Sequence, residues 1–153
     1  MMSKFWVYCV MLLIALPGCI GNEEPDIFYG EDINPPIPVS DFLLVDQGGE
    51  YFSFSQYEGK VVVIAFLFTR CPDICPIVSA NLDYLQMMLG DEYGETVEIL
   101  SITVDPWTDN HTVLSDYSEQ RGLEWPHLTG ELEDLENVWL EFDVGLTTYD
   151  TDT

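Results

Sequence analysis

The sequence predicts an α/β fold built on a parallel sheet, and three observations support this prediction. Residues 61–68 form an uninterrupted apolar run, which is typical of a central strand covered on both faces. A second strand is expected over 97–104. Apolar residues recur at helical spacing after each of these strands, and strands that alternate with helices form parallel sheets.

A β-hairpin is expected at the start of the domain. The apolar and aromatic segments 42–45 and 51–54 flank the turn 46–50, in which two adjacent glycines permit positive φ angles. The run 61–68 then forms the first strand of the parallel sheet, and the helix that follows it ends before Gly90. The apolar positions of this helix are Ile77, Leu82, Leu85, Met88 and Leu89.

Two further helices are expected in the second half of the chain. The strand 97–104 leads to a helix over 111–121, with Gly122 directly behind it. Residues 125–129 form a short strand or loop. The apolar positions of the third helix are Leu132, Leu135, Val138, Trp139 and Phe142.

The composition suits one packed domain with a strongly acidic surface. The chain has 153 residues, of which 47% are hydrophobic, and this is ample for a core. It carries 4 Lys and Arg residues against 28 Asp and Glu residues, a formal net charge of -24. Nucleic acids and anionic lipid headgroups are recognised by clustered Lys and Arg, so the composition argues against both as partners. The acidity indicates a solvated surface before it indicates a face for a cationic partner or for metal capture.

Residues 1–18 are expected to form a signal peptide. The apolar run 5–16 follows a single lysine and, at about 12 residues, is too short to span a bilayer comfortably. The sequence Leu16-Pro17-Gly18-Cys19 resembles a bacterial or archaeal lipobox, so Cys19 is the predicted lipid-modified first residue of the mature chain. An uncleaved anchor and simple secretion are the alternatives. Lipid modification, an uncleaved anchor and simple secretion all place the domain outside the cytoplasm. Lipid modification at Cys19 places it on the extracytoplasmic face of the cell membrane.

Three segments are therefore expected. Residues 1–18 are the signal peptide, and residues 19–38 are a lipid-anchored tether rich in proline and acidic residues. Residues 39–153 are the folded domain.

Two cysteines remain for chemistry, because Cys9 falls in the signal peptide and Cys19 at the lipid site. Cys71 and Cys75 lie between the predicted first strand and the helix after it, in a turn that two prolines stiffen. A helix N-terminus favours the thiolate, which is the form that binds metals and attacks disulfides. The pair can therefore bind a soft metal, with Cu(I) favoured and zinc as the main competitor, or form and break a disulfide.

Four stretches of the chain match a known pattern. They are Phe66-Leu67-Phe68-Thr69-Arg70-Cys71-Pro72-Asp73-Ile74-Cys75-Pro76, Tyr57-Glu58-Gly59-Lys60-Val61-Val62-Val63, Ser101-Ile102-Thr103-Val104-Asp105-Pro106 and Leu128-Thr129-Gly130. Together they resemble the Sco/SenC family of thioredoxin-like copper proteins, which serve assembly of the copper centre of cytochrome c oxidase. The resemblance covers residues 40–148, and the cysteine motif is its most specific part.

The resemblance implies a thioredoxin-like α/β fold with an N-terminal β-hairpin. It also implies copper ligation by Cys71 and Cys75 together with a histidine, which the family places after the third helix in an Asp-His-Ser/Thr context. The sequence reaches Thr153 without this histidine, so the third ligand is expected beyond Thr153. Compared with the family, the C-terminal strands and the last helix are missing from the sequence, which is therefore interpreted as C-terminally truncated.

Two histidines are candidates for a substitute ligand, but another reading is preferred for each. His111 is expected to be an exposed or capping residue at a helix start. His127 is expected to lie at the edge of the core. Neither matches the position of the family's histidine.

Other residues near the motif have weaker functional readings. Asp73 either tunes the thiolate, contacts a partner, or bonds to nearby backbone as an ordinary turn residue. Asp105 and Pro106 are expected to shape the loop that faces the cysteines. Met87 and Met88 are interpreted as helix packing rather than as a copper relay.

Three functions are weighed for the site. The preferred one is a copper metallochaperone that passes copper to an oxidase subunit, with copper loading coupled to the redox state of the thiols. The alternative is a thiol–disulfide oxidoreductase acting on the cysteines of the oxidase subunit or of other extracytoplasmic proteins. Another copper chaperone or a thiol reductant is a further expected partner. A peroxidase is disfavoured, because Thr69 and Arg70 match a peroxidatic site only superficially.

Overall fold

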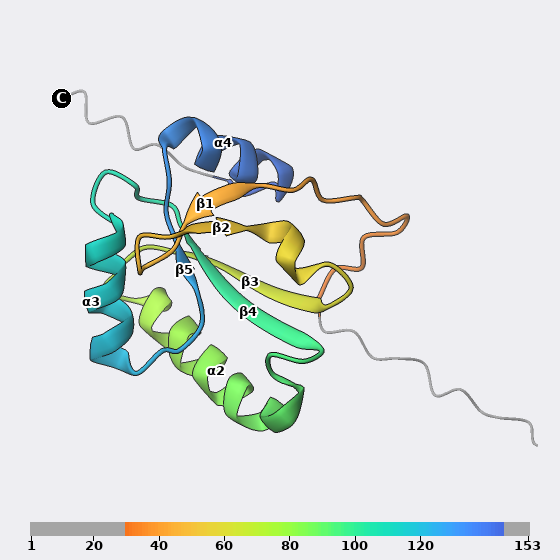
Figure 1. Ribbon diagram of the computed structural model, residues 1–153, viewed down its shortest axis with the longest axis horizontal. Coiled ribbons are helices and arrows are strands. Elements are labelled where there is room, and N and C mark those ends of the chain that lie inside the picture. Colours follow the sequence, from red (N-terminus) through yellow and green to blue (C-terminus); the bar gives the residue numbers. More distant parts are fainter. Residues whose placement is uncertain (1–29, 146–153) are drawn as a thin grey trace, which may run out of the picture. The chain divides into compact units, whose positions relative to one another are not determined.

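A parallel three-stranded sheet lies at the centre of the fold in the computed structural model, which describes residues 30–145 (Figure 1). The chain divides into two compact units, Met1–Ile37 and Pro38–Thr153, and every element below belongs to the second. The predicted signal peptide and Cys19 lie outside the described residues. None of the described helices is long and apolar enough to cross a bilayer.

The sheet consists of β3 (Val61–Leu67), β4 (Val97–Thr103) and β5 (His127–Leu128), in the order β3-β4-β5. Both strand pairs are parallel. Because parallel neighbours need a crossover, α2 (Ile74–Leu89) connects the first pair and α3 (His111–Arg121) connects the second. This arrangement confirms the predicted α/β fold with a parallel core.

The position of β3 in the sheet differs from the prediction of a central strand. Among residues 30–145, β3 pairs only with β4, so β4 is the central strand and β3 is an edge strand. The five residues Val62–Phe66 are consequently half-buried, whereas the six residues Glu98–Thr103 of β4 are all buried. The apolar run correctly predicts that both faces of β3 are covered, but it does not indicate which backbone edges of the strand are paired.

Alternate residues of the strands point to two different apolar layers. On one face of the sheet, α2 and α3 pack over β4, and the buried residues of this layer are Leu82, Ile99, Tyr117, Leu123 and Trp125. Figure 1 shows α2 and α4 (Leu132–Glu141) on opposite sides of the sheet.

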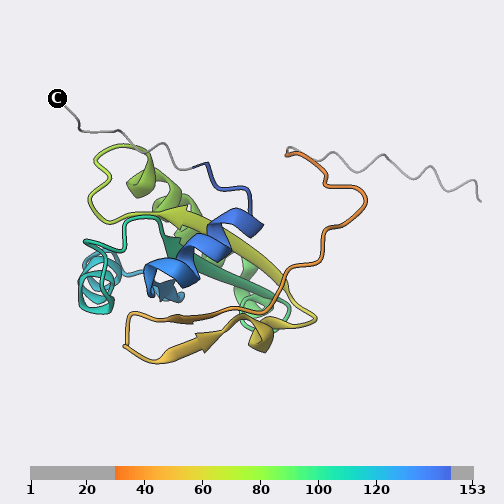
Figure 2. The same cartoon turned by 90° about the horizontal axis from the view of Figure 1, so that it is seen from above.

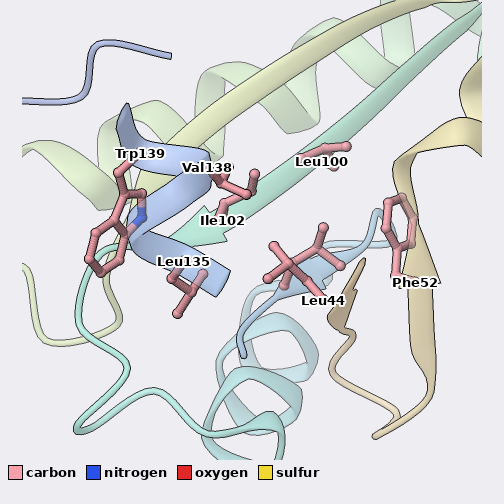
Figure 3. Packing of buried hydrophobic residues seen from close by; sticks show 8 residues of the cluster. Leu44, Phe52, Leu100, Ile102, Leu135, Val138 and Trp139 are labelled. Atoms are coloured by element: carbon pink, nitrogen blue, oxygen red, sulfur yellow. The ribbon is translucent and has the colours of Figure 1, made fainter. Parts of the chain in front are cut away.

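The second layer lies between the sheet, α4 and the N-terminal hairpin. Figure 2 shows α4 lying over the strands of the sheet. The buried residues, most of which are drawn in Figure 3, are Leu44, Phe52, Leu100, Ile102, Leu128, Leu135, Val138 and Trp139. Trp139 also donates its indole N–H to the carbonyl of Thr103 at 3.1 Å, which fixes α4 at the end of β4.

The hairpin consists of β1 (Leu43–Val45) and β2 (Tyr51–Ser53), which pair antiparallel as predicted. Asp46 organises the turn, because its Oδ1 accepts hydrogen bonds from the N–H groups of Gly48 and Glu50 at 2.8 and 3.0 Å. Gly49 has a φ of 84°, which a glycine adopts without strain. A short 3-10 helix, η1 (Phe54–Tyr57), leads from the hairpin toward the sheet.

The helices begin and end close to the predicted positions. Gly90, with a φ of 53°, follows α2 and opens the short 3-10 helix η2 (Gly90–Glu92). At the start of α3, the Asn110 side chain accepts a hydrogen bond from the N–H of Val113 at 3.0 Å. Gly122 ends α3 in the left-handed conformation, with a φ of 68°.

The apolar face of α2 is narrower than the sequence predicts. Its buried residues are Cys75, Ser79 and Leu82, which lie on one side of the helix. Ile77 and Met88 were predicted to face the core, yet they are 53% and 64% exposed. Both lie on the side of the helix opposite to the buried residues, because a helix that rests on a sheet with one face leaves the other face uncovered.

Candidate metal-binding site

The two cysteines lie where β3 leads into α2. Cys71 sits in the connecting turn and Cys75 in the first turn of the helix, as the strand–turn–helix prediction requires. Both are free thiols, only 9% and 5% exposed, and they pack with Leu67 at the end of β3. The site is therefore a pair of sulfur atoms held at the boundary of the core.

The two sulfur atoms have different acidities. The Cys75 thiol donates a hydrogen bond to Cys71 and thereby lowers the pKa of Cys71, and the N–H groups of Asp73, Cys75 and Ile74 lower it further. One of these bonds, from the N–H of Cys75 to Cys71 Sγ, measures 3.3 Å. Burial raises the pKa of Cys75, and so does its bond to Cys71. Cys71 is therefore the sulfur that ionises first, at the N-terminal end of a helix that favours negative charge.

Asp109 fastens the segment before Cys71 to the end of β4. Its carboxylate is fully buried and accepts hydrogen bonds from the N–H of Thr69 at 3.0 Å and from Thr103 Oγ1 at 2.7 Å. A third bond comes from the Thr69 hydroxyl. A charge without solvent needs such donors, so Asp109, Thr69 and Thr103 form one unit.

A surface ion pair makes a second connection between the same loops. Arg70 Nη2 lies 2.7 Å from Asp105 Oδ2, with the Arg70 side chain 67% exposed. Asp105 thus binds the residue next to Cys71, as expected of a residue that shapes the facing loop. The hydroxyl of Thr69 and the guanidinium of Arg70 are both engaged by carboxylates, which argues further against a peroxidatic role.

Sequence reasoning missed Asp109. In the sequence it precedes Asn110 and the helix that follows, where an aspartate is an ordinary turn or capping residue. Only its complete burial reveals its role. The spacing of Thr69, Thr103 and Asp109 along the chain contains no signal that they meet.

Neither histidine joins the cysteine pair. Among residues 30–145, no group of three or more His, Cys, Asp and Glu side chains is placed to hold a metal ion. His111 is exposed at the start of α3, where Asn110 provides the cap. The described site therefore offers two ligands, Cys71 and Cys75.

His127 lies inside the core, not at its edge as predicted. It is fully buried and stacks on Trp125 with ring centroids 5.5 Å apart. Its Nδ1 lies 2.9 Å from the carbonyl of Trp125, while its Nε2 has no hydrogen-bond partner. Burial lowers the pKa of His127, so the ring is held neutral.

Two further sequence interpretations change. Asp73 occupies the N-cap position of α2 and is exposed, but its side chain makes no capping hydrogen bond. The predicted hydrogen bond from Asp73 to nearby backbone is therefore wrong. Met87 and Met88 are 67% and 64% exposed, so their interpretation as helix packing is wrong.

The arrangement supports two kinds of chemistry. A thiolate beside a thiol supplies two soft donors, which suit Cu(I) because this ion accepts a low coordination number. The same pair can lose two electrons and form a disulfide. The unequal pKa values of Cys71 and Cys75 suit both, because one sulfur is ready to bind or attack and the other holds a proton.

Comparisons with known proteins agree on one family. The sequence model of the SCO1/SenC family matches residues 31–153. The SCO2-like protein of Rickettsia felis is 33% identical over 104 residues, which cover 68% of this chain and 50% of that protein.

Solved structures are similar in fold. The crystal structure of yeast Sco1 with copper bound gives a TM-score of 0.66 at 32% identity and covers 73% of this chain and 62% of that one. A structure that identifies a disulfide switch in BsSco, a member of the Sco family of cytochrome c oxidase assembly proteins, gives 0.63 at 30% identity, with 75% and 70% covered. These similarities confirm the predicted thioredoxin-like fold.

The match extends over only part of the longer relatives. The chain spans 50% of the length of the R. felis protein and 41% of Protein sco1 of Schizosaccharomyces pombe, which is 33% identical over 111 residues.

Proposed function

The chain belongs to the SCO1/SenC family, and from this premise we propose that it is a copper metallochaperone for assembly of cytochrome c oxidase. Copper is the cargo, bound as Cu(I) by Cys71 and Cys75. The observation that carries the proposal is the free, buried thiol pair at the N-terminal end of α2, where hydrogen bonds lower the pKa of Cys71. The copper-bound yeast Sco1 and the oxidase-assembly family of BsSco support it.

Binding of Cu(I) requires both sulfur atoms as thiolates. The Cys71 thiolate offers the first ligand, and Cys75 releases its proton to solvent as it becomes the second. Asp109 keeps the turn in place through Thr69 while this happens. A third ligand is expected from a histidine beyond Thr153.

The second candidate is a thiol–disulfide oxidoreductase acting on the same partner. The Cys71 thiolate attacks a partner disulfide, and one partner sulfur leaves and takes up a proton. Cys75 then loses its proton and attacks the sulfur of Cys71, which releases the second partner sulfur. Two electrons pass to the partner, and Cys71 and Cys75 become a disulfide. The disulfide switch of BsSco and the unequal acidities of the two cysteines favour this candidate.

The proposed location is the extracytoplasmic face of the cell membrane. Cys19 carries the lipid, and residues 19–38 tether the domain. Metabolic labelling with a radioactive fatty acid tests this: label is expected on the wild-type chain and not on Cys19→Ala. A labelled Cys19→Ala chain would contradict it.

Competition for Cu(I) separates the two candidates. The reduced full chain is titrated against a chromogenic Cu(I) chelator, with Cys71→Ser, Cys75→Ser and the double variant in parallel. One Cu(I) per wild-type chain is expected, with loss of binding in all three variants. A wild-type chain that holds no copper, yet reduces a protein disulfide in a Cys71-dependent way, would favour the oxidoreductase.

A further inference from the structure

Helix α2 has an apolar outer surface that begins at the cysteine pair. Ile74, Ile77, Tyr84 and Met88 are 59%, 53%, 59% and 64% exposed. Their spacing of three, seven and four residues places them along one side of the helix. Figure 1 shows α2 at the periphery, with the sheet on one side and no described element on the other. These four residues are called the α2 stripe below.

The α2 stripe is unusual for this chain because it lacks charge. The 16 residues of α2 include one charged side chain, Asp83, whereas the 10 residues of α4 include four acidic ones. A helix face that merely contacts water in a chain of net charge -24 is expected to resemble α4. On the same side, Asn81 is exposed between Ile77 and Tyr84, and it is polar but uncharged. Exposed apolar side chains gathered on one helix side without charge instead indicate a contact surface.

The stripe is continuous with the thiols. Ile74 lies between the two cysteines in the sequence, and its exposed side chain opens the stripe. Trp107, 74% exposed, belongs to the loop in which Asp105 binds Arg70, the residue before Cys71. The two segments next to the thiols, α2 and this loop, therefore both present exposed apolar groups.

Acidic side chains surround the stripe. Asp73 precedes α2, Asp83 lies within it, and Asp91 and Glu92 follow it, all of them exposed. A second copy of the chain would bring the same carboxylates against these, so its approach is repelled. A partner with basic residues around an apolar patch would be attracted.

We propose that the α2 stripe, together with Trp107, docks the protein that accepts copper from Cys71 and Cys75, and that this acceptor presents an apolar patch with a basic rim. The proposal rests on the copper-chaperone function proposed above. Docking excludes water around the sulfur atoms. Copper then passes by ligand exchange: acceptor donors replace the two sulfurs, Cys75 regains its proton, and Cu(I) keeps its oxidation state.

The test is the rate of copper transfer. The full chain loaded with Cu(I) is mixed in a stopped-flow instrument with the purified copper-binding domain of the oxidase subunit from the same organism. The double variant Tyr84→Glu/Met88→Glu is expected to slow the second-order transfer about tenfold, because buried apolar anchors dominate docking. Copper affinity of the variant, measured by chelator competition, is expected to stay unchanged.

A matched control is Leu140→Glu. Leu140 is 79% exposed on α4, away from the cysteine-bearing helix, and its substitution adds the same kind of charge. It is expected to leave the transfer rate unchanged. A basic rim on the acceptor also predicts that Asp83→Lys slows transfer and that added salt slows the wild-type chain.

Each of the following results would overturn the proposal. Unchanged transfer by the double variant would remove the docking surface and leave the chaperone function standing. A wild-type chain that holds copper but does not transfer it would count against both the docking surface and the chaperone function. If the wild-type chain is a dimer, the double variant is a monomer, and copper transfer is unchanged, the stripe would be a contact between two copies of the chain. Weaker binding of the double variant to phosphatidylcholine vesicles, with unchanged transfer, would assign it to the membrane.

Discussion

The neighbours of Cys71 and Cys75 shift the pKa values of the two thiols in opposite directions. Cys71 receives hydrogen bonds from the first turn of α2, which lower its pKa, whereas burial raises the pKa of Cys75. The difference depends on where the turn holds Cys71. The residues that hold the turn are therefore as important to the site as the sulfurs.

Removal of the Asp109 charge is expected to loosen this turn. In Asp109→Asn, an amide group faces the donors of Thr69 and Thr103, and a buried unmatched donor costs about 2 kcal/mol. The free energy of unfolding, measured with urea, is expected to fall by that amount. Asp116→Asn, at an exposed position of α3, is the matched control and is expected to change stability by less than about 0.5 kcal/mol. Equal effects of the two substitutions would contradict the role of Asp109.

His127 makes stability depend on pH below its ordinary pKa of 6.5. Burial lowers the pKa in the folded chain, so below pH 6.5 the unfolded chain binds more protons than the folded chain. The free energy of unfolding therefore falls as pH decreases from 6.5 through the lowered folded pKa, and this contribution is constant at higher pH. The His127→Gln variant lacks this pH-dependent contribution to the free energy of unfolding. Urea unfolding at about pH 7.5 and about pH 5.5 is expected to show a smaller loss for the variant.

An NMR titration of the imidazole provides the direct check on His127. The ring is expected to titrate below its ordinary value. His111→Gln, which removes an exposed imidazole, is the comparison that shows whether the pH dependence belongs to the buried ring. A His127 ring that titrates at or above its ordinary value would rule out the explanation by burial.

At the residue scale, the sequence predicts which cysteines carry the proposed chemistry and does not predict what holds them. Cys71 and Cys75 were identified from a local motif. Asp109 acts through Thr69, which lies 40 residues away in the sequence, and no local pattern reports such a contact. His127 was predicted at the edge of the core, next to Trp125 and Pro126 in the sequence, and this position alone does not show that the ring is fully buried.

The helices and turns of this chain are determined by local signals. Asn110 caps α3, and Gly122 ends it. The hairpin turn is closed by Asp46. These elements could be predicted closely because each signal is a few residues from the structure it determines.

Loss of the Asn110 cap is expected to destabilise α3. Asn110→Ala removes the acceptor for the N–H of Val113 and is expected to cost about 1 kcal/mol. Thr112→Ala, in the same first turn and exposed, is the control and is expected to be close to neutral. Urea unfolding measures both. A cost for Thr112→Ala as large as that for Asn110→Ala would mean that the cap is not the cause.

The same local signals fail where packing decides. Helical spacing assigned Ile77 and Met88 to the core because both are apolar, but α2 contacts the sheet along a narrower side. The apolar run of β3 likewise predicted a central strand, since its composition reports covered faces and not paired edges.

The whole molecule carries a net charge of -24, and its like charges repel one another in the folded state. Added salt screens this repulsion over about 10 Å at 0.1 M. The melting temperature is therefore expected to rise between about 0.05 and about 0.5 M NaCl. KCl is expected to act equally, because screening depends on ionic strength. A melting temperature that falls or stays constant would show that self-repulsion is negligible.

At this scale, the parallel α/β core and the thioredoxin-like architecture were predicted correctly. The order of strands in the sheet was not, because it depends on contacts between distant segments. The third copper ligand remains a prediction, expected beyond Thr153.

The free edge of β3 gives salt a second effect. Residues 61–67 contain no charged side chain, and in the described structure one edge of their backbone has no neighbouring strand. Such an edge can template pairing between molecules, which natural proteins commonly prevent with charged edge residues. Within residues 30–145, the prevention falls to the repulsion between whole molecules, which salt screens. Storage in concentrated brine would then raise the temperature at which each molecule melts and lower the concentration at which the molecules remain dispersed.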